Sequence, residues 1–294
     1  MKKLLVIGAT GNIGTAVIDA LLAHSNKEEV QIVAGCRNIA KAKKNFATWH
    51  NQVQWLSMDL ENTATFEEEL STTNCVFLLR PPHLADMKVF QPIIDLFVKN
   101  NIKEIVFLSV QGVEKSTIIP HYKIEQSIKQ SDLKYVFIRP SYFMQNLTTE
   151  LLADIKHKKA IVLPAGNAKF NWVDVQNIGE AIAEIIHNFA PYCNQAIEIT
   201  GKENKNFESV ATLLSGITGT NINYKSVNPF QFFFIKKKEG IPFGKILVLF
   251  MLHFIARFEP EPIISDNYTK ITGNQPTLLA QFIARKKQHF IKGD

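Results

Sequence analysis

The segment that most constrains the fold is the opening stretch KKLLVIGATGNIGTAVIDALLAH, residues 2–24. An apolar run typical of a buried strand leads into a turn containing Gly8, Gly11 and Gly14, and apolar residues then recur at helical spacing. A tight turn out of a parallel strand needs a residue that tolerates unusual backbone angles, and a pyrophosphate resting on backbone N–H groups needs the space of a missing Cβ. The helix N-terminus adds a positive dipole. This order of strand, turn and helix predicts an α/β fold with a dinucleotide site near residue 8.

The end of the next predicted strand, VQIVAGCRN at residues 30–38, indicates which dinucleotide is bound. NAD-binding domains of this kind carry a carboxylate there, which bonds the ribose 2′-hydroxyl. Here no acid is present, Arg37 stands in that region, and Lys41 follows one helical turn later. Basic side chains favour a 2′-phosphate through charge-assisted hydrogen bonds, so the sequence predicts NADP(H). A solvated basic helix start is the alternative interpretation of these side chains.

Length, cysteine usage and charge limit the class of protein. The chain has 294 residues, 46% of them hydrophobic, which suffices for one large domain or one domain with a smaller appendage. Cys36, Cys75 and Cys193 are far apart without metal-ligand spacing, which indicates reduced thiols in a cytoplasmic protein and no metal site. Residues 221–294 hold 11 Lys and Arg against 5 Asp and Glu, which equals the whole net charge of +6. Because no motif accompanies that charge, nucleic-acid binding is not expected.

The most apolar stretch of the chain is ILVLFMLHFIA, residues 246–256. It is too short to span a bilayer, which takes about 20 residues, so stable membrane insertion is not expected. The preceding residues 228–245 are rich in phenylalanine with interspersed lysines. We interpret this region first as the core of a C-terminal lobe. A second interpretation is an apolar cleft for a flat aromatic substrate, with Phe232–Phe234 on a lid, and lipid contact is a weaker third.

Further segments extend the pattern of the glycine turn along the chain. In order they are GATGNIG, CRNIAK, MDLEN, FLLRPP, IKEIVFLSVQGV, LKYVFIRPSYFMQNL and FNWVDVQNIGEAIAEII. Together they resemble the NmrA-like branch of the atypical short-chain dehydrogenases/reductases. The resemblance implies an α/β fold with a Rossmann-type doubly wound parallel sheet and a smaller α/β C-terminal substrate lobe. Residues 1–155 would form the NADP(H)-binding domain, and residues 156–294 most of the substrate lobe, with segments returning to the sheet.

The resemblance also implies which residues bind the cofactor. The glycine turn would hold the pyrophosphate, the basic pair the 2′-phosphate, and residues after later strands the adenine and the nicotinamide. In chain order the implied residues are Gly8, Thr10, Gly11, Asn12, Ile13, Gly14, Arg37, Lys41, Asp59, Leu60, Leu79, Arg80, Ser109, Lys123, Ser141, Tyr142 and Phe143.

The segment around Lys123 departs from the pattern of the wider superfamily at one expected catalytic residue. Most reductases of the wider superfamily use Tyr-x-x-x-Lys, in which the tyrosine protonates a carbonyl oxygen. Lys123 matches the lysine, but Ile119 replaces the tyrosine, and Tyr122 points about 100° away from Lys123 on a helix. Reduction of an ordinary ketone needs an acid near the developing alkoxide, so that activity is not expected. Lys123 and Tyr142 are the predicted catalytic residues.

Three functions remain open at this level. Hydride transfer to a quinone or a similar conjugated acceptor gives a delocalised, low-pKa product and needs no strong acid. Lys123 alone could relay the proton, as in the isoflavone-reductase-like relatives, and His121 with Glu125 on the same helix face is a further candidate pair. The third function is a non-catalytic NADP(H) sensor that acts through a protein partner. We predict an NADPH-dependent reductase of a small, apolar or aromatic acceptor, and leave a homodimer or a regulatory partner open.

Overall fold

The computed structural model describes residues 1–49, 51–81, 84 and 86–291, and these divide into two compact units. Unit 1 comprises Met1–Pro140, Val175–Ile199 and Asp266–Asn274. Unit 2 comprises Ser141–Asp174, Thr200–Ser265 and Gln275–Asp294. The chain therefore leaves and re-enters unit 1 twice. The division into domains at residue 155 that the sequence suggested stays a prediction.

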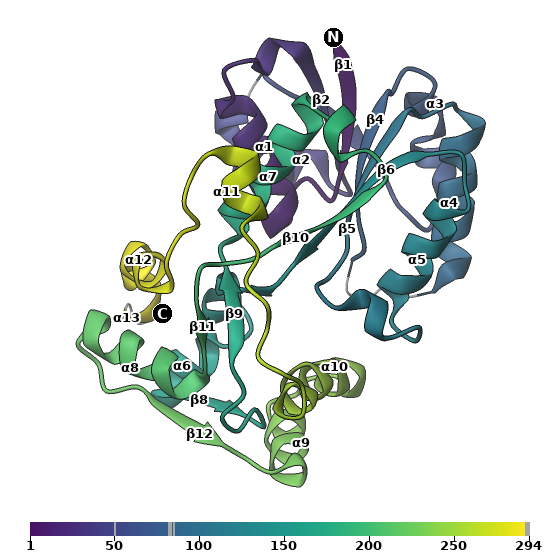
Figure 1. The fold of residues 1–294 in the computed structure, drawn as a ribbon. Helices are drawn as coiled ribbons and strands as arrows, with labels where there is room; N and C mark the ends of the chain where they lie inside the picture. The colour runs from purple at the N-terminus through teal and green to yellow at the C-terminus, as the bar shows by residue number, and fades with distance from the viewer. Residues whose placement is uncertain (50, 82–83, 85, 292–294) are drawn as a thin grey trace. The chain divides into compact units, whose positions relative to one another are not determined.

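Unit 1 is built on a parallel sheet, seven-stranded within the described residues, in the order β10-β6-β5-β4-β1-β2-β3 (Figure 1). Its strands are β1 (Lys2–Ile7), β2 (Val30–Cys36), β3 (Gln54–Ser57), β4 (Cys75–Leu79), β5 (Glu104–Leu108), β6 (Lys134–Pro140) and β10 (Gln195–Ile199). The strand β1 pairs with β2 on one side and with β4 on the other, so the strand order reverses there. Ligands of open parallel sheets bind beyond the carboxyl ends of the strands at such a reversal.

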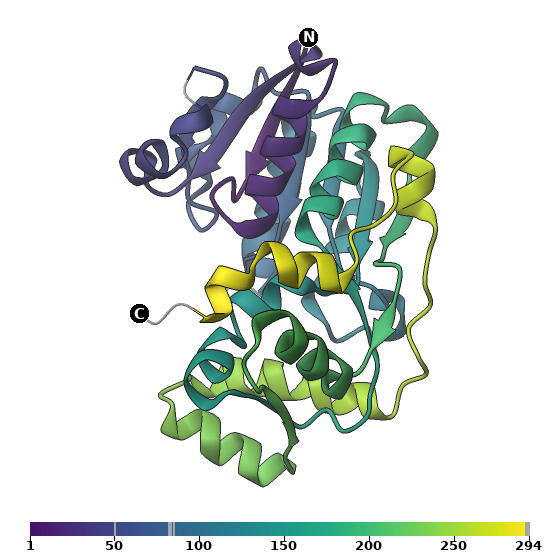
Figure 2. The same cartoon turned by 90° about the vertical axis from the view of Figure 1, so that its left-hand side faces the viewer.

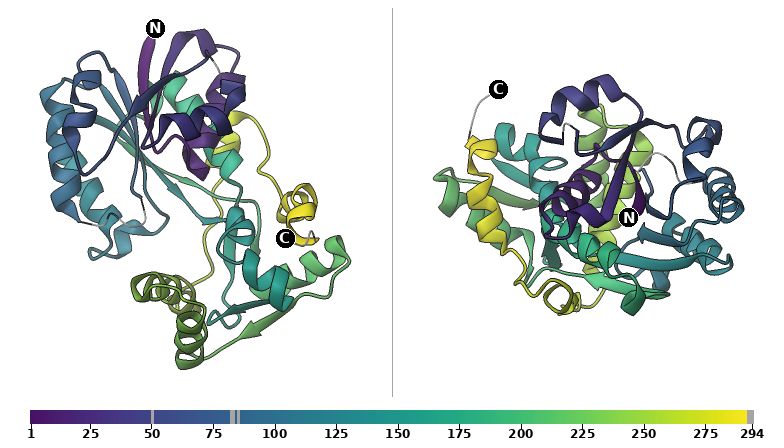
Figure 3. Two further views of the ribbon diagram at one scale, coloured as in Figure 1. Left: turned by 180° about the vertical axis from the view of Figure 1, so that it is seen from behind. Right: turned by 90° about the horizontal axis from the view of Figure 1, so that it is seen from above.

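Helices cover both faces of this sheet, which confirms the predicted doubly wound α/β fold (Figures 2 and 3). The helices α1 and α7 pack together on one face, with α11 against α7, and α4 packs with α5 on the other face. The α-helices of unit 1 are α1 (Asn12–Ala23), α2 (Ile39–Asn45), α3 (Glu67–Leu70), α4 (Met87–Lys99), α5 (Pro120–Lys129), α7 (Val175–His187) and α11 (Asn267–Thr272). Short 3-10 turns connect them: η1 (Lys27–Glu29), η2 (Ala47–Trp49), η3 (Thr63–Thr65), η4 (Val113–Lys115) and η6 (Ala190–Tyr192).

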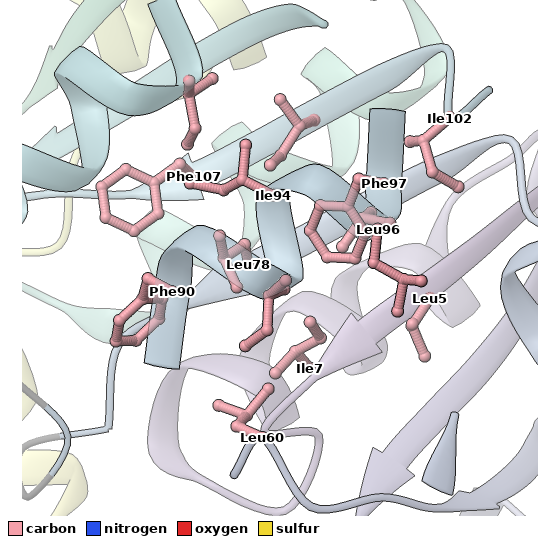
Figure 4. Packing of buried hydrophobic residues seen from close by; sticks show 14 of the residues in the cluster. Leu5, Ile7, Leu60, Leu78, Phe90, Ile94, Leu96, Phe97, Ile102 and Phe107 are labelled. Atoms are coloured by element: carbon pink, nitrogen blue, oxygen red, sulfur yellow. The ribbon is translucent and has the colours of Figure 1, made fainter. Parts of the chain in front are cut away.

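The core between the sheet and α4 explains why the strands are continuous apolar runs. Strands covered on both faces bury every side chain, so alternation of polar and apolar residues is lost. The side chains of Leu5, Leu78 and Phe107 from the sheet meet Phe90 and Phe97 from α4 (Figure 4). All five are fully buried, and each contributes about 1.5–3 kcal/mol by leaving water. This packing holds the carboxyl ends of the strands, and hence the glycine turn, in place.

Unit 2 is a smaller mixture of short strands and helices. A three-stranded sheet has the order β11-β9-β7, and β12 pairs with β8, within the described residues. The strands are β7 (Tyr142–Phe143), β8 (Ala160–Leu163), β9 (Phe170–Val173), β11 (Asn204–Lys205) and β12 (Asn223–Ser226). The helices are η5 (Met144–Thr148), α6 (Leu152–Lys158), α8 (Phe207–Thr218), α9 (Pro229–Lys238), α10 (Phe243–Phe254), η7 (Ile255–Arg257), α12 (Leu279–Arg285) and α13 (Lys287–Ile291).

The core of unit 2 gathers the large aromatic side chains of its helices and strands. Trp172, Phe207, Phe232 and Phe282 are each fully buried in one cluster. The position of Phe232 agrees with the first interpretation of its segment, as lobe core, rather than with a lid. No helix of the described residues has the length and apolarity needed to cross a membrane.

Candidate functional site

The glycine turn between β1 and α1 forms a cradle that excludes side chains. Gly8 has a φ of +71°, a left-handed conformation that favours glycine. A Cβ on Gly14 would lie 2.3 Å from the backbone oxygen of Gly8, closer than any real contact. Gly11 is the N-cap of α1 and provides no side-chain cap, so the N–H groups of the first turn remain for another acceptor. The exposed residues of the turn are Thr10, Gly11 and Asn12, followed by the buried Ile13.

Neighbouring strands hold this turn in place on both sides. On the β2 side, the backbone N–H of Ala9 donates to the oxygen of Gly35 over 3.1 Å. On the β4 side, Leu79 is the last strand residue, and its Cδ1 atom lies 3.0 Å from where a Cβ of Gly8 would stand. The structure therefore brings the predicted pyrophosphate residues and Leu79 together at the point where the strand order reverses.

The predicted 2′-phosphate residues lie directly beside the turn. Since Ile7 pairs with Gly35, Arg37 is only two residues beyond the strand position that flanks the turn. Lys41 is in the first turn of α2, where its backbone N–H donates to the Asn38 side chain over 2.9 Å. Both basic side chains are exposed, and no ion pair joins either of them to another described residue. They are positioned as a basic patch at the carboxyl end of β2.

Asp59 and Leu60 follow β3, whose end adjoins that of β2 through the pairing of Cys36 with Ser57. The backbone N–H of Asp59 donates to the Thr65 hydroxyl over 2.9 Å, and its carboxylate accepts from the backbone N–H of Glu61 over 3.0 Å. Leu60 is buried in the core of unit 1 (Figure 4). The exposed Asp59 and the buried Leu60 thus form the turn at the far side of the basic patch.

Ser109, directly after β5, carries a buried hydroxyl group that lacks a partner. Its side chain is 2% exposed, and its backbone N–H donates to the oxygen of Ile138 over 2.7 Å. Its Oγ atom has no hydrogen-bond partner among the described residues. An unpaired buried hydroxyl destabilises a protein by about 1–3 kcal/mol. A polar ligand group at the carboxyl end of β5 would remove that penalty.

Arg80 orders the chain that leaves β4. Its Nη1 atom donates to the backbone oxygens of Pro81 and Leu84, over 3.1 and 2.8 Å. Partial burial lowers the pKa of Arg80, but a guanidinium remains charged at neutral pH. The positive charge therefore stays near the end of β4, on the predicted nicotinamide side of the cradle.

The helix α5 places the candidate residues of the sequence on two different sides. Ile119 is the N-cap of α5, so the position of the missing tyrosine lies at the start of the helix. Lys123 is exposed, whereas Glu125 is buried among the residues that face the core. His121 is beside the Phe107 ring, with 6.2 Å between the ring centroids. Burial and the nearby Arg80 charge lower the pKa of His121 to about 3, so its imidazole is neutral at pH 7.

Glu125 is bound to an arginine that sequence reasoning did not single out. Arg139 of β6 donates from Nε and Nη2 to the two carboxylate oxygens of Glu125, over 3.0 and 2.7 Å. Its Nη1 atom donates to Glu114 over 2.9 Å. Glu125 is 1% exposed, so this bidentate pair ties α5 to the sheet from inside. The partner of Glu125 is thus Arg139, whereas His121 lies beside the Phe107 ring.

The remaining predicted residues, Ser141, Tyr142 and Phe143, belong to unit 2. The Ser141 hydroxyl donates to the Asn171 side chain over 2.6 Å. Tyr142 and Phe143 form β7, which pairs in parallel with Trp172 and Val173 of β9. Their places in unit 2 are therefore set by strand pairing and by one side-chain hydrogen bond.

The Tyr142 hydroxyl is bound to a buried histidine, His253 of α10. The two groups are 2.9 Å apart, and the other ring nitrogen of His253 lies 2.7 Å from the backbone oxygen of Leu249. Because a carbonyl oxygen only accepts, Nδ1 of His253 carries the proton, and Nε2 accepts from Tyr142. Burial raises the pKa of Tyr142 and lowers the pKa of His253 to about 4. His253 is the one polar side chain of ILVLFMLHFIA, a signal that could have revealed it.

The described residues contain free cysteines but no cluster of side chains suited to a metal ion. Cys36 and Cys75 are buried, Cys193 is half-buried, and all three are free thiols. Burial raises the pKa of Cys75, which keeps its thiol protonated and unreactive at neutral pH. Among the described residues, His, Cys, Asp and Glu side chains form no group of three or more that could hold a metal ion.

Comparison with known proteins gives consistent matches along the chain. The model of the NmrA-like family matches residues 1–266. "Prestalk A differentiation protein A" of Dictyostelium discoideum is 27% identical over 95% of this chain and 91% of that protein. "NAD(P)H azoreductase" of Xenophilus azovorans is 24% identical, over 95% of this chain and 96% of that protein. The solved structure of the Escherichia coli NADPH-dependent quinone oxidoreductase QOR2 with NADPH has a TM-score of 0.85 at 21% identity, covering 96% of this chain and 99% of that one.

Proposed function

This chain belongs to the NmrA-like family, and from that premise we propose that it binds NADP(H) at the carboxyl ends of β1 and β2. The observation that carries the proposal is the glycine turn, where a Cβ on Gly14 would collide with the Gly8 backbone at 2.3 Å. Such a turn with an uncapped helix start fits a pyrophosphate. The exposed Arg37 and Lys41 fit a 2′-phosphate, since no carboxylate stands there to repel it.

The rest of the cofactor site follows from the same placement. The turn formed by Asp59 and Leu60 would adjoin the adenine. The nicotinamide side would comprise Leu79, Arg80 and Ser109. The Ser109 hydroxyl, which has no partner among the described residues, supports a polar ligand group there. Within unit 2 and α5, the further contacts that we propose are Lys123, Ser141, Tyr142 and Phe143.

We propose that the reaction is reduction of a small conjugated acceptor, such as a quinone. NADPH supplies the hydride when it is bound. A quinone that receives a hydride becomes a hydroquinone monoanion, whose charge is delocalised, so that solvent or Lys123 can complete the protonation. Two features support an acceptor of this kind: the N-cap of α5 is the apolar Ile119, and the imidazole of His121 is neutral. The positive Arg80 would stabilise the developing anion.

The test of this activity is NADPH oxidation, followed by absorbance, with a panel of quinones, azo dyes and enones. We expect turnover with at least one conjugated acceptor, none with simple ketones, and slower turnover for Lys123→Ala. Lys129→Ala, an exposed lysine at the end of the same helix, is the matched control and should leave the rate unchanged. Tight NADPH binding without turnover of any acceptor would contradict the proposal.

A second candidate function is an NADP(H) sensor that acts through a protein partner. One finding favours it: the relative that is 27% identical is named for differentiation and not for a reaction. The sensor predicts that partner capture from an extract differs between NADP⁺ and NADPH. Equal capture with both forms would contradict this second function.

A further inference from the structure

The helix α10 in unit 2 carries apolar side chains on both of its sides. One side packs into the core of unit 2 through Ile246, which is 2% exposed, with Leu249 and Phe250 packed against the same core. The opposite side presents residues at positions i, i+1, i+4, i+5 and i+8, which share one helical face. These residues are 40–65% exposed and define the α10 apolar face: Leu247, Val248, Met251, Leu252 and, at the start of η7, Ile255.

More exposed aromatic side chains stand at both ends of this helix. Phe243, the first residue of α10, is 70% exposed, and Phe258, shortly after its end, is 74% exposed. The adjacent helix α9 adds Phe234, which is 71% exposed. Monomeric proteins rarely present so much apolar surface to water without a binding partner.

Exposed lysines without an ion pair among the described residues lie in the same segment, at the end of α9. Residues 229–258 contain five basic side chains and one acid, Glu239, but Lys236 pairs with Asp154 and Lys245 with Glu150. Glu239 is already neutralised, because it accepts from Lys236 and Lys158. Lys237 and Lys238 at the end of α9 are exposed, and no described residue forms an ion pair with them. The same short segment thus combines exposed apolar groups with free positive charge.

We propose that the α10 apolar face docks reversibly on the surface of an anionic lipid bilayer. Leu247, Val248, Met251, Leu252 and Ile255 would enter the boundary between headgroups and acyl chains, while Lys237 and Lys238 contact the anionic headgroups. The 12 residues of α10 extend over about 18 Å, short of the roughly 30 Å of a hydrocarbon core. The helix therefore lies on the membrane and does not span it. The proposal is independent of the reductase activity.

Charge favours lipid over a second copy of this chain as the occupant. In a two-fold dimer each face meets an identical face, so the interface carries the lysines of both copies. Like charges across an interface oppose association, whereas an anionic bilayer neutralises the same lysines. An anionic bilayer thus matches both the positive charge of the segment and its apolar face.

The experiment is co-sedimentation of the full chain with vesicles of phosphatidylcholine and phosphatidylglycerol, compared with phosphatidylcholine alone. We expect binding to the anionic vesicles that weakens as salt is added. Val248→Ser with Leu252→Ser should weaken binding about tenfold or more, because two large apolar side chains no longer leave water. Lys237→Glu with Lys238→Glu should weaken binding at least roughly fivefold per lysine, on anionic vesicles only.

Ile118→Ser is the matched control, since Ile118 in unit 1 is 82% exposed and lies outside the α10 face. It should bind vesicles like the unchanged chain, and thermal unfolding should verify that every variant is folded. Absence of binding to either vesicle, or equal binding by the Val248→Ser/Leu252→Ser variant, overturns the proposal. Light scattering adds a second readout. A dimer that this variant dissociates, without vesicle binding by the unchanged chain, would assign the face to a second copy.

Discussion

Single residues decide whether the cradle accepts a phosphate, and Gly14 shows this most directly. The obstacle at Gly14 is backbone, namely the oxygen of Gly8, and not the end of a flexible side chain that could move aside. A side chain there would displace the turn itself. By contrast, Gly216 in α8 has nothing within 4 Å of the place of a Cβ. The two glycines therefore provide opposite cases within one chain.

We predict that Gly14→Ala abolishes measurable NADPH binding and lowers the free energy of unfolding by about 1–3 kcal/mol, through overpacking. Gly216→Ala should raise it by about 0.5–1 kcal/mol, because alanine is the better helix former, and leave binding unchanged. Calorimetric titration and urea unfolding measure both quantities. Undiminished NADPH affinity in Gly14→Ala would exclude the cradle as the pyrophosphate site.

Arg37 should determine which dinucleotide binds. A charge-assisted hydrogen bond contributes about 1.5–3 kcal/mol to binding. Arg37→Ala should therefore lower the affinity for NADPH by roughly 10- to 100-fold and change the affinity for NADH little. Lys44→Ala, an exposed lysine near the end of α2, is the control and should change neither affinity strongly. Titration calorimetry with both dinucleotides decides the matter. Equal weakening of NADPH and NADH would remove the 2′-phosphate role from Arg37.

At the scale of elements, the pairing of α5 with β6 depends on a buried ion pair. The Arg139 guanidinium binds both oxygens of Glu125, which is 1% exposed, and also the half-exposed Glu114. Removing one partner of a buried pair leaves an uncompensated charge, while removing an exposed partner matters little. Arg139 therefore positions α5, and with it Lys123, against the sheet.

Arg139→Met should lower the free energy of unfolding by about 3–5 kcal/mol, because Glu125 would remain buried without its cation. Glu114→Gln, the matched change at the exposed end of the same guanidinium, should lower it by about 1 kcal/mol or less. Urea unfolding of both variants gives the comparison. Similar losses in the two would show that Glu125 does not depend on Arg139 for compensation of its charge.

The contact of β7 with α10 should make stability depend on pH. The pKa of His253 is lowered to about 4 by burial, below the value of 6.5 for an unfolded histidine. As the pH falls, the unfolded chain binds the proton before the folded one. The contribution of His253 to the free energy of unfolding is therefore fully present above pH 6.5 and falls by about 1.4 kcal/mol per pH unit towards pH 4. His253→Gln should remove this part of the slope, and exposed His157→Gln should not. The measurement is the free energy of unfolding across that pH range. The same pH slope in His253→Gln as in the unchanged chain would show that His253 is solvated and would contradict the prediction.

At the scale of the whole molecule, the sequence predicted what depends on local pattern. The strand, glycine turn and helix of residues 2–24 are encoded within one segment, and the parallel sheet follows from their repetition with helices along the chain. Partners that are distant in sequence could not be predicted. The bond between Tyr142 and His253 joins residues 111 positions apart, and Arg139 and Glu125 come from different elements. The exposed face of α10 could not be predicted either, because apolar residues lie on both the buried and the exposed sides of this helix.

The two proposals together predict how an acceptor reaches the enzyme. Suppose that the acceptor is a quinone and that the α10 apolar face docks on lipid. A quinone with a long isoprenoid chain then lies in the anionic vesicles, at the same surface on which the protein is concentrated. Val248→Ser with Leu252→Ser should then slow NADPH oxidation by the long-chain quinone severalfold, and leave the rate with a short-chain, water-soluble quinone unchanged. The ratio of the rate with the long-chain quinone to the rate with the short-chain quinone distinguishes an effect on access to the acceptor from an effect on hydride transfer.

Each outcome of this rate comparison has a distinct physical meaning. Slowing with both quinones would show that the α10 apolar face supports the reaction itself, by lining the acceptor site or by holding unit 2 together. No slowing with either would show that lipid contact is irrelevant to delivery, even where vesicle binding is measured. Selective slowing with the long-chain quinone is expected only if surface docking raises the local concentration of the enzyme at its acceptor. That selectivity would connect the exposed helix of unit 2 with the cofactor site of unit 1 without requiring any direct contact between them.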